Sequence, residues 1–180
     1  MQTANYPGPF LGRVVDQETN QPIEGAVVHV DWHLTHPFSR QTYFDAKEVL
    51  TDKNGKFFIR RNWSILPWRN FFINSETIIF KAGYGIVEGY YGPDLHSVAE
   101  SIRNLSETER KRIGPGAFFN IRFEGELPVF LLKKLSKEEA ANDFPVIYPN
   151  QEAPLRKRRL ILEEINRHLE LFGWHTRVIK

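Results

Sequence analysis

Residues 25–34 alternate between two sets of side chains, and this alternation constrains the fold more than any other feature of the chain. One face of the segment holds Ala26, Val28, Val30, Trp32 and Leu34, and the other holds Val27, His29, Asp31 and His33. Successive side chains of an extended strand point to opposite sides. The segment is therefore predicted to be a β-strand whose first face, which includes Trp32, lies in a hydrophobic core.

Most of the first 135 residues have the same character. Short apolar segments at 10–16, 41–51, 56–61, 77–81, 85–91, 117–123 and 127–133 predict further strands, with a helical insertion at about 94–113. The segment Asp52-Lys53-Asn54-Gly55 is typical of a tight hairpin, in which Asp52 accepts backbone N–H groups and Gly55 takes a positive φ. Gly25 is expected to permit the turn that precedes residues 26–34.

The last part of the chain, residues 136–180, is predicted to be a connector followed by an amphipathic helix over 155–172. The apolar stripe of this helix consists of Ile161, Leu162, Ile165, Leu169 and Phe172. One helix cannot bury such a stripe alone, so it is expected to pack on the sandwich of residues 10–135 or on a partner, and we favour its own sandwich.

Composition excludes several kinds of function. The chain has 180 residues and no cysteine, which rules out disulfides, thiolate nucleophiles, cysteine-bound zinc and iron–sulfur clusters. Lys and Arg together number 24 and Asp and Glu 22, so no strong overall field favours nucleic acid. No apolar run approaches the ~20 residues of a membrane span, and the first residues do not resemble a signal peptide.

Three groups of residues resemble a known family. They are Gly12-Arg13-Val14-Val15-Asp16, Pro22-Ile23-Glu24-Gly25-Ala26-Val27-Val28 and Thr51-Asp52-Lys53-Asn54-Gly55-Lys56-Phe57. In this order they resemble the carboxypeptidase regulatory-like domain over about residues 10–90. The resemblance implies a seven-stranded, transthyretin-like (prealbumin-like) β-sandwich of the bacterial cell envelope. It also implies an extracytoplasmic location, in the periplasm or at the cell surface, and allows a lipid anchor in the precursor.

Enzymes with related folds use residues that this chain lacks. The intradiol dioxygenases carry paired iron-binding histidines after the corresponding hairpin, whereas residues 56–95 contain no histidine. No Gly-x-Ser-x-Gly, Walker-type or Gly-x-Gly-x-x-Gly motif is present, so we expect no cofactor. The sequence therefore favours a protein that is not an enzyme.

The strongest candidate for metal chemistry is the set of His29, Asp31 and His33. Side chains two residues apart on a strand share a face, and two histidines with a carboxylate are a known ligand set for zinc or iron. The competing interpretation, which we favour, is a solvated outer face that holds two histidines.

Two further groups are candidates for binding. Exposed aromatic side chains can stack on sugars or anchor a protein, and the candidates here are Trp63, Trp68, Phe71, Phe72, Tyr90 and Tyr91. The alternative is a flap that covers the end of the sandwich. The basic run Arg156-Lys157-Arg158-Arg159 could contact phosphate, anionic lipid or an acidic partner, or could simply be solvated.

These observations predict a non-catalytic binding or accessory module of the bacterial cell envelope, with a protein or carbohydrate partner reached through the aromatic residues or the C-terminal helix. Two alternatives stay open. One is a small metal-dependent enzyme built on His29, Asp31 and His33. The other is a structural subunit that docks on a neighbour through its C-terminal helix.

Overall fold

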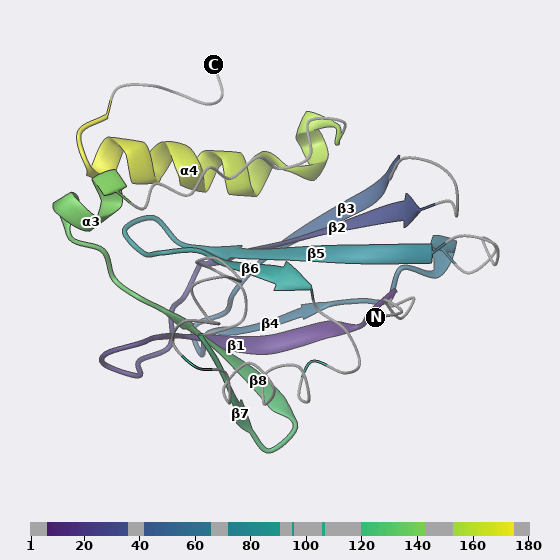
Figure 1. Cartoon of the computed structure of the whole chain (residues 1–180), viewed down its shortest axis with the longest axis horizontal. Helices are drawn as coiled ribbons and strands as arrows, with labels where there is room; N and C mark the ends of the chain where they lie inside the picture. Colours follow the sequence, from purple (N-terminus) through teal and green to yellow (C-terminus); the bar gives the residue numbers. More distant parts are fainter. Residues whose placement is uncertain are drawn as a thin grey trace.

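The chain forms two stacked β-sheets with a helix lying on the outer face of one of them (Figure 1). The computed structural model describes residues 7–35, 42–65, 72–90, 95, 106, 120–142 and 153–174. Its strands are β1 (Phe10–Asp16), β2 (Val27–Thr35), β3 (Thr42–Leu50), β4 (Lys56–Ile59), β5 (Phe72–Phe80), β6 (Val87–Tyr90), β7 (Ile121–Glu124) and β8 (Leu127–Leu132). The helices are α3 (Lys137–Asn142) and α4 (Arg159–Leu171), with short 3-10 helices η1 (Trp63–Ile65) and η2 (Leu155–Lys157).

Each sheet has four strands. One has the order β4-β1-β8-β7 and the other the order β3-β2-β5-β6. The pairing of β1 with β8 is parallel, and the other pairings are antiparallel. The prediction of a mainly β sandwich is therefore confirmed, with eight strands in the described residues where the family resemblance implies seven. The helical insertion at 94–113 lies outside the described residues, apart from Leu95 and Ser106.

The core lies between the two sheets, and the alternation in β2 accounts for it. Val28, Val30 and Trp32 are each fully buried there, together with Phe10, Val14 and Phe130 from the facing sheet. The ring of Trp32 meets that of Phe10 edge to face, with centroids 5.6 Å apart. Burying side chains of this size contributes about 1.5–3 kcal/mol each, so this layer is a main source of stability.

The turn between β3 and β4 is built by its predicted residues, but the predicted hairpin is wrong, because these two strands lie in different sheets and do not pair with each other. Asp52 Oδ1 accepts the backbone N–H groups of Asn54 and Lys56, both at 2.8 Å. Gly55 has a φ of 73°, and a Cβ atom there would lie 2.3 Å from the carbonyl oxygen of Val14. Gly25 also has a positive φ, 68°. The turn carries the chain from the end of β3 in one sheet to the start of β4 in the other.

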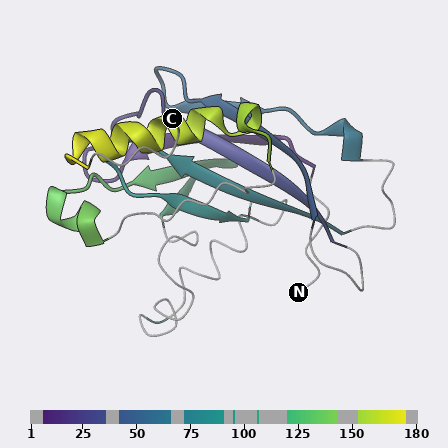
Figure 2. The ribbon, with the colours of Figure 1, turned by 90° about the horizontal axis from the view of Figure 1, so that it is seen from above.

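Helix α4 covers the outer face of the β3-β2-β5-β6 sheet, as Figure 2 shows from above. Ile161, Leu162, Ile165 and Leu169 are buried against Val27 and Phe80 of the sheet. The predicted helix over 155–172 is thus divided into η2 and α4, with Arg158 between them. Among the described residues, no helix has the length and apolarity needed to cross a bilayer.

The outer face of β2 is buried, which corrects the interpretation of a solvated face. The exposed fractions of His29, Asp31 and His33 are 0%, 4% and 7%. The pattern of alternation is right, but it cannot distinguish a face that meets water from one that a helix covers. Both faces of this central strand are enclosed.

Candidate functional site

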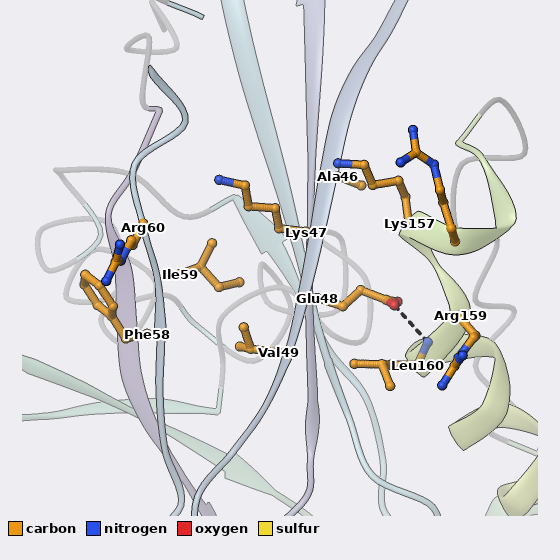
Figure 3. A pocket seen from close by; sticks show the side chains of 11 residues that line it. Ala46, Lys47, Glu48, Val49, Phe58, Ile59, Arg60, Lys157, Arg159 and Leu160 are labelled. Carbon is orange, nitrogen blue, oxygen red and sulfur yellow. Dashed lines mark hydrogen bonds between the residues drawn. The ribbon is translucent and has the colours of Figure 1, made fainter. Parts of the chain in front are cut away.

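A groove of about 660 Å³ opens at one edge of the sandwich (Figure 3). Its floor is β3, one wall is β4, and the other wall is η2 with the first turn of α4. β3 and β4 are the edge strands of their sheets, so the groove lies where the two layers separate. The lining residues are Ala46, Lys47, Glu48, Val49, Phe58, Ile59, Arg60, Arg156, Lys157, Arg159 and Leu160.

The groove is strongly basic. Among the described residues of its lining, five are cations (Lys47, Arg60, Arg156, Lys157 and Arg159), and the only acid is Glu48. Lys157 is paired with Asp45 at 2.8 Å, and Arg159 with Glu163 at 3.0 Å. Arg60 and Arg156 are exposed and form no ion pair with any described residue. A groove lined by one sign of charge concentrates counter-ions even when the whole molecule is almost neutral.

The carboxylate of Glu48 is bound by a histidine and by backbone N–H groups beneath the groove. One oxygen accepts the backbone N–H of Leu160 at 2.8 Å, and the other accepts that of Ile161 at 3.1 Å. These are free N–H groups of the first turn of α4, where a carboxylate is stabilised by the helix dipole. The second oxygen also lies 3.0 Å from Nδ1 of His29. Because Glu48 has these partners, its charge opposes the cations of the groove only weakly.

His29 lies between two carboxylates under the helix. Its Nδ1 contacts Glu48 and its Nε2 lies 3.0 Å from Oδ1 of Asp31. Burial disfavours the charged imidazolium, but the two carboxylates outweigh burial and raise the pKa of His29 from 6.5 to about 9. His29 is therefore a cation at neutral pH. It neutralises part of the negative charge that Asp31 and Glu48 bring into the buried face.

This geometry does not assemble the metal site considered for His29, Asp31 and His33. Both ring nitrogens of His29 lie 3.0 Å from carboxylate oxygens, Nδ1 from Glu48 and Nε2 from Asp31. His33 lies four residues beyond His29 on β2, with its ring centroid 6.4 Å from that of Tyr43. Within the described ranges, no group of three or more His, Asp or Glu residues could hold a metal ion.

Burial and nearby carboxylates both act on the phenol of Tyr43. Burial together with the carboxylates of Asp45 and Asp31 raises the pKa of Tyr43 to about 12, although Arg156 opposes the shift. The phenol is therefore neutral over the whole physiological range. Acidic groups gather beneath η2 and α4, whereas basic groups line the groove.

The second half of α4 is fastened to the turn between β5 and β6. Glu164 accepts the backbone N–H of Ala82 at 2.9 Å and pairs with Arg167 at 2.7 Å. His168 Nδ1 accepts the N–H of Gly83 at 3.2 Å. Burial lowers the pKa of His168 while nearby Glu164 partly opposes the shift, which keeps the ring neutral and its Nδ1 able to accept. Polar contacts thus hold both halves of the helix on the sheet.

Of the aromatic candidates, Trp63 is the one whose side chain the structure describes. It is 64% exposed in η1, and the guanidinium of Arg61 lies 5.1 Å from its ring centroid. Phe72 begins β5 and Tyr90 ends β6, but their side chains lie outside what is described. Trp68, Phe71 and Tyr91 also lie outside the described residues.

Sequence reasoning identified the basic run but missed Glu48 and the groove. Glu48 lies directly opposite His29 in the register of β2 and β3, so a correct strand alignment would have paired them. The groove combines residues 46–49, 58–60, 156–157 and 159–160, which come from three separate parts of the sequence. Only the packing of α4 brings the basic run to the edge of the sandwich.

Comparison with known proteins gives little guidance. No family model matches the chain, and a search of curated proteins returns no match. Among solved structures, a 9R-lipoxygenase from Cyanothece PCC8801 shares 17% identity over 38% of this chain and 10% of its own, with a TM-score of 0.26. The matched part thus spans about a tenth of that protein's length. A similarity this low supports no argument about fold or function.

Proposed function

We propose that the chain is a non-catalytic binding module that holds an anionic ligand in the groove between β3, β4 and η2. The observation that carries the proposal is the charge of the groove. Of its five cations, Lys157 and Arg159 are paired with Asp45 and Glu163. The carboxylate of the groove lining, Glu48, is bound by His29 and the first turn of α4. Arg60 and Arg156, which lack ion pairs among the described residues, supply guanidinium groups suited to carboxylate or phosphate.

The roles of the buried histidines support a binding function over catalysis. His29 and His168 hold α4 on the sheet through Glu48 and the N–H of Gly83. Both side chains are fully buried, with 0% exposed. General acid–base chemistry needs a side chain that can reach a substrate, and these two are enclosed by the helix.

We further propose that the module is a carboxypeptidase regulatory-like domain of the bacterial cell envelope, located in the periplasm or at the cell surface. The resemblance rests on the Gly12–Asp16, Pro22–Val28 and Thr51–Phe57 motifs. Two four-stranded sheets and the Asp52–Gly55 turn are compatible with it. Fractionation of cells that express the complete reading frame tests the location, and recovery of the protein in the cytoplasm would refute it.

The binding proposal is tested with the full chain and a panel of simple anions. The probes are inorganic phosphate, an oligogalacturonate and an oligoglutamate, each titrated calorimetrically at low salt. The double variant Arg60→Glu with Arg156→Glu should bind the successful probe about tenfold more weakly, because two exposed attractions become repulsions. Lys53→Glu changes an exposed cation in the β3–β4 turn, outside the groove lining, and should bind like the wild type. Failure of every anion to bind, or equal binding by all three proteins, would refute the proposal.

A further inference from the structure

We propose that the ligand of this groove is an extended acidic peptide that adds to β3 as a fifth strand of its sheet. The inference rests on the proposed function, since it names the ligand class of the same groove. Its basis is the coincidence of three features: an open edge strand on the groove floor, an inward-pointing lysine on that strand, and cations on both walls.

The first feature is the free edge of β3. This strand is at the end of the order β3-β2-β5-β6, so β2 is the only strand of the described residues that pairs with it. In an antiparallel edge strand, every second residue turns its N–H and C=O away from its neighbour. Residues 45–50 make no backbone hydrogen bond outside the β2 ladder within the described part of the chain. Such an edge is a template for a strand from another molecule.

The second feature indicates what kind of strand can pair there. Lys47 lies on β3 with its Nζ 5.8 Å from the centroid of the Trp32 ring, which is in the core. An inward-pointing charge on an edge strand opposes pairing with another copy of the same strand. A second copy would also bring its own basic groove against this one, and the two would repel. A strand with negative charge instead gains from the same cations.

The third feature predicts the side-chain pattern of the peptide. Figure 3 shows Arg60 on the β4 wall, and Lys157 and Arg159 on the opposite wall. A strand between these walls points successive side chains alternately to the two sides. Because cations lie on both sides, a peptide with several acidic residues in a row should bind better than one with an acidic residue at every second position. The part of β3 that lines the groove, residues 46–49, matches a peptide segment of about four to six residues at ~3.3 Å per residue.

An acidic polysaccharide would meet the same charges, but it has no regular row of N–H and C=O groups to pair with β3. This difference provides the test. The probe is a fluorescein-labelled hexaglutamate, compared with the same peptide N-methylated at every residue and with an oligogalacturonate of similar charge. N-methylation keeps the carboxylates and removes every backbone donor.

We expect the hexaglutamate to bind at least about tenfold more tightly than the other two probes, a difference that the loss of several hydrogen bonds readily produces. Hydrogen exchange of amides within residues 45–50 should slow when it binds. The Arg60→Glu, Arg156→Glu double variant should lose this binding, and Lys53→Glu should keep it. Equal binding of all three probes with unchanged exchange in β3 would overturn the strand inference and leave the anion groove intact. If none of the probes binds, the proposed function falls as well.

Discussion

The buried ion pairs of His29 make a specific prediction about how stability depends on pH. The two carboxylates raise the pKa of His29 to about 9 in the folded protein, against 6.5 when it is exposed to water. Because the folded-state pKa is the higher one, the folded protein holds this proton more tightly than the unfolded chain does. The stabilisation is fully present below pH 6.5, and it is lost as the pH rises through 9.

The magnitude follows from the size of the shift. One pKa unit corresponds to 1.36 kcal/mol, so a shift of this size is worth roughly 3 kcal/mol of unfolding free energy between pH 6 and pH 10. Lysine and tyrosine side chains also titrate in that range. The relevant quantity is therefore the difference in unfolding free energy between the wild type and His29→Gln, in which the titrating group is absent but the side chain stays polar.

Urea denaturation of both proteins at intervals from pH 6 to pH 10 measures this difference. The advantage of the wild type should shrink steadily across the interval, by roughly 3 kcal/mol in total. A parallel NMR titration should find the His29 ring changing charge near pH 9. If the difference between the two proteins is the same at pH 6 and pH 10, or if His29 titrates near 6.5, the argument that Asp31 and Glu48 hold the proton is wrong.

Three further predictions test other parts of the structure by urea denaturation. Trp32→Ala should cost roughly 3–5 kcal/mol because Trp32 is fully buried, whereas Trp63→Ala, at a side chain 64% exposed, should change stability by less than about 1 kcal/mol. Gly55→Val should destabilise far more than Gly125→Val: both glycines have positive φ, but only at Gly55 does a new Cβ meet backbone atoms. Burial lowers the pKa of His168, so the stability advantage of the wild type over His168→Gln should diminish as the pH falls below 6.5. This trend is opposite to that expected for His29. A difference in unfolding free energy that does not change with pH would contradict the prediction.

Local chemistry was enough to predict much of the sandwich. The period-two pattern in residues 26–34 places Trp32 in the core, and the structure has it fully buried. The turn sequence from Asp52 to Gly55 specifies its own geometry, because a short carboxylate and a glycine satisfy it within four residues. Information of this kind is contained in a few adjacent residues, so it can be read without knowing what packs around them.

The candidate site could not be predicted in the same way, because its parts come from separate segments. The pattern of β2 gave no sign that a helix more than 120 residues later in the chain covers His29. The pairing of His29 with Glu48 depends on the register of β2 and β3. The sequence between these strands contains no tight-turn motif that would fix this register. The four cations at 156–159 were visible, but their position beside Arg60 depends on where the helix docks.

Glu48 links the docking of α4 to the basic groove. The same carboxylate binds the first turn of α4, contacts His29 and lines the groove floor. Three of the five groove cations belong to η2 and the start of α4, so they keep their positions only while this end of the helix is seated. A change that removes the charge of Glu48 would therefore weaken the docking of α4. The same change would also release the three cations of η2 and α4 from their positions in the groove. Binding of an anion in the groove must in turn stabilise the seated helix, because a ligand favours the state that binds it more tightly.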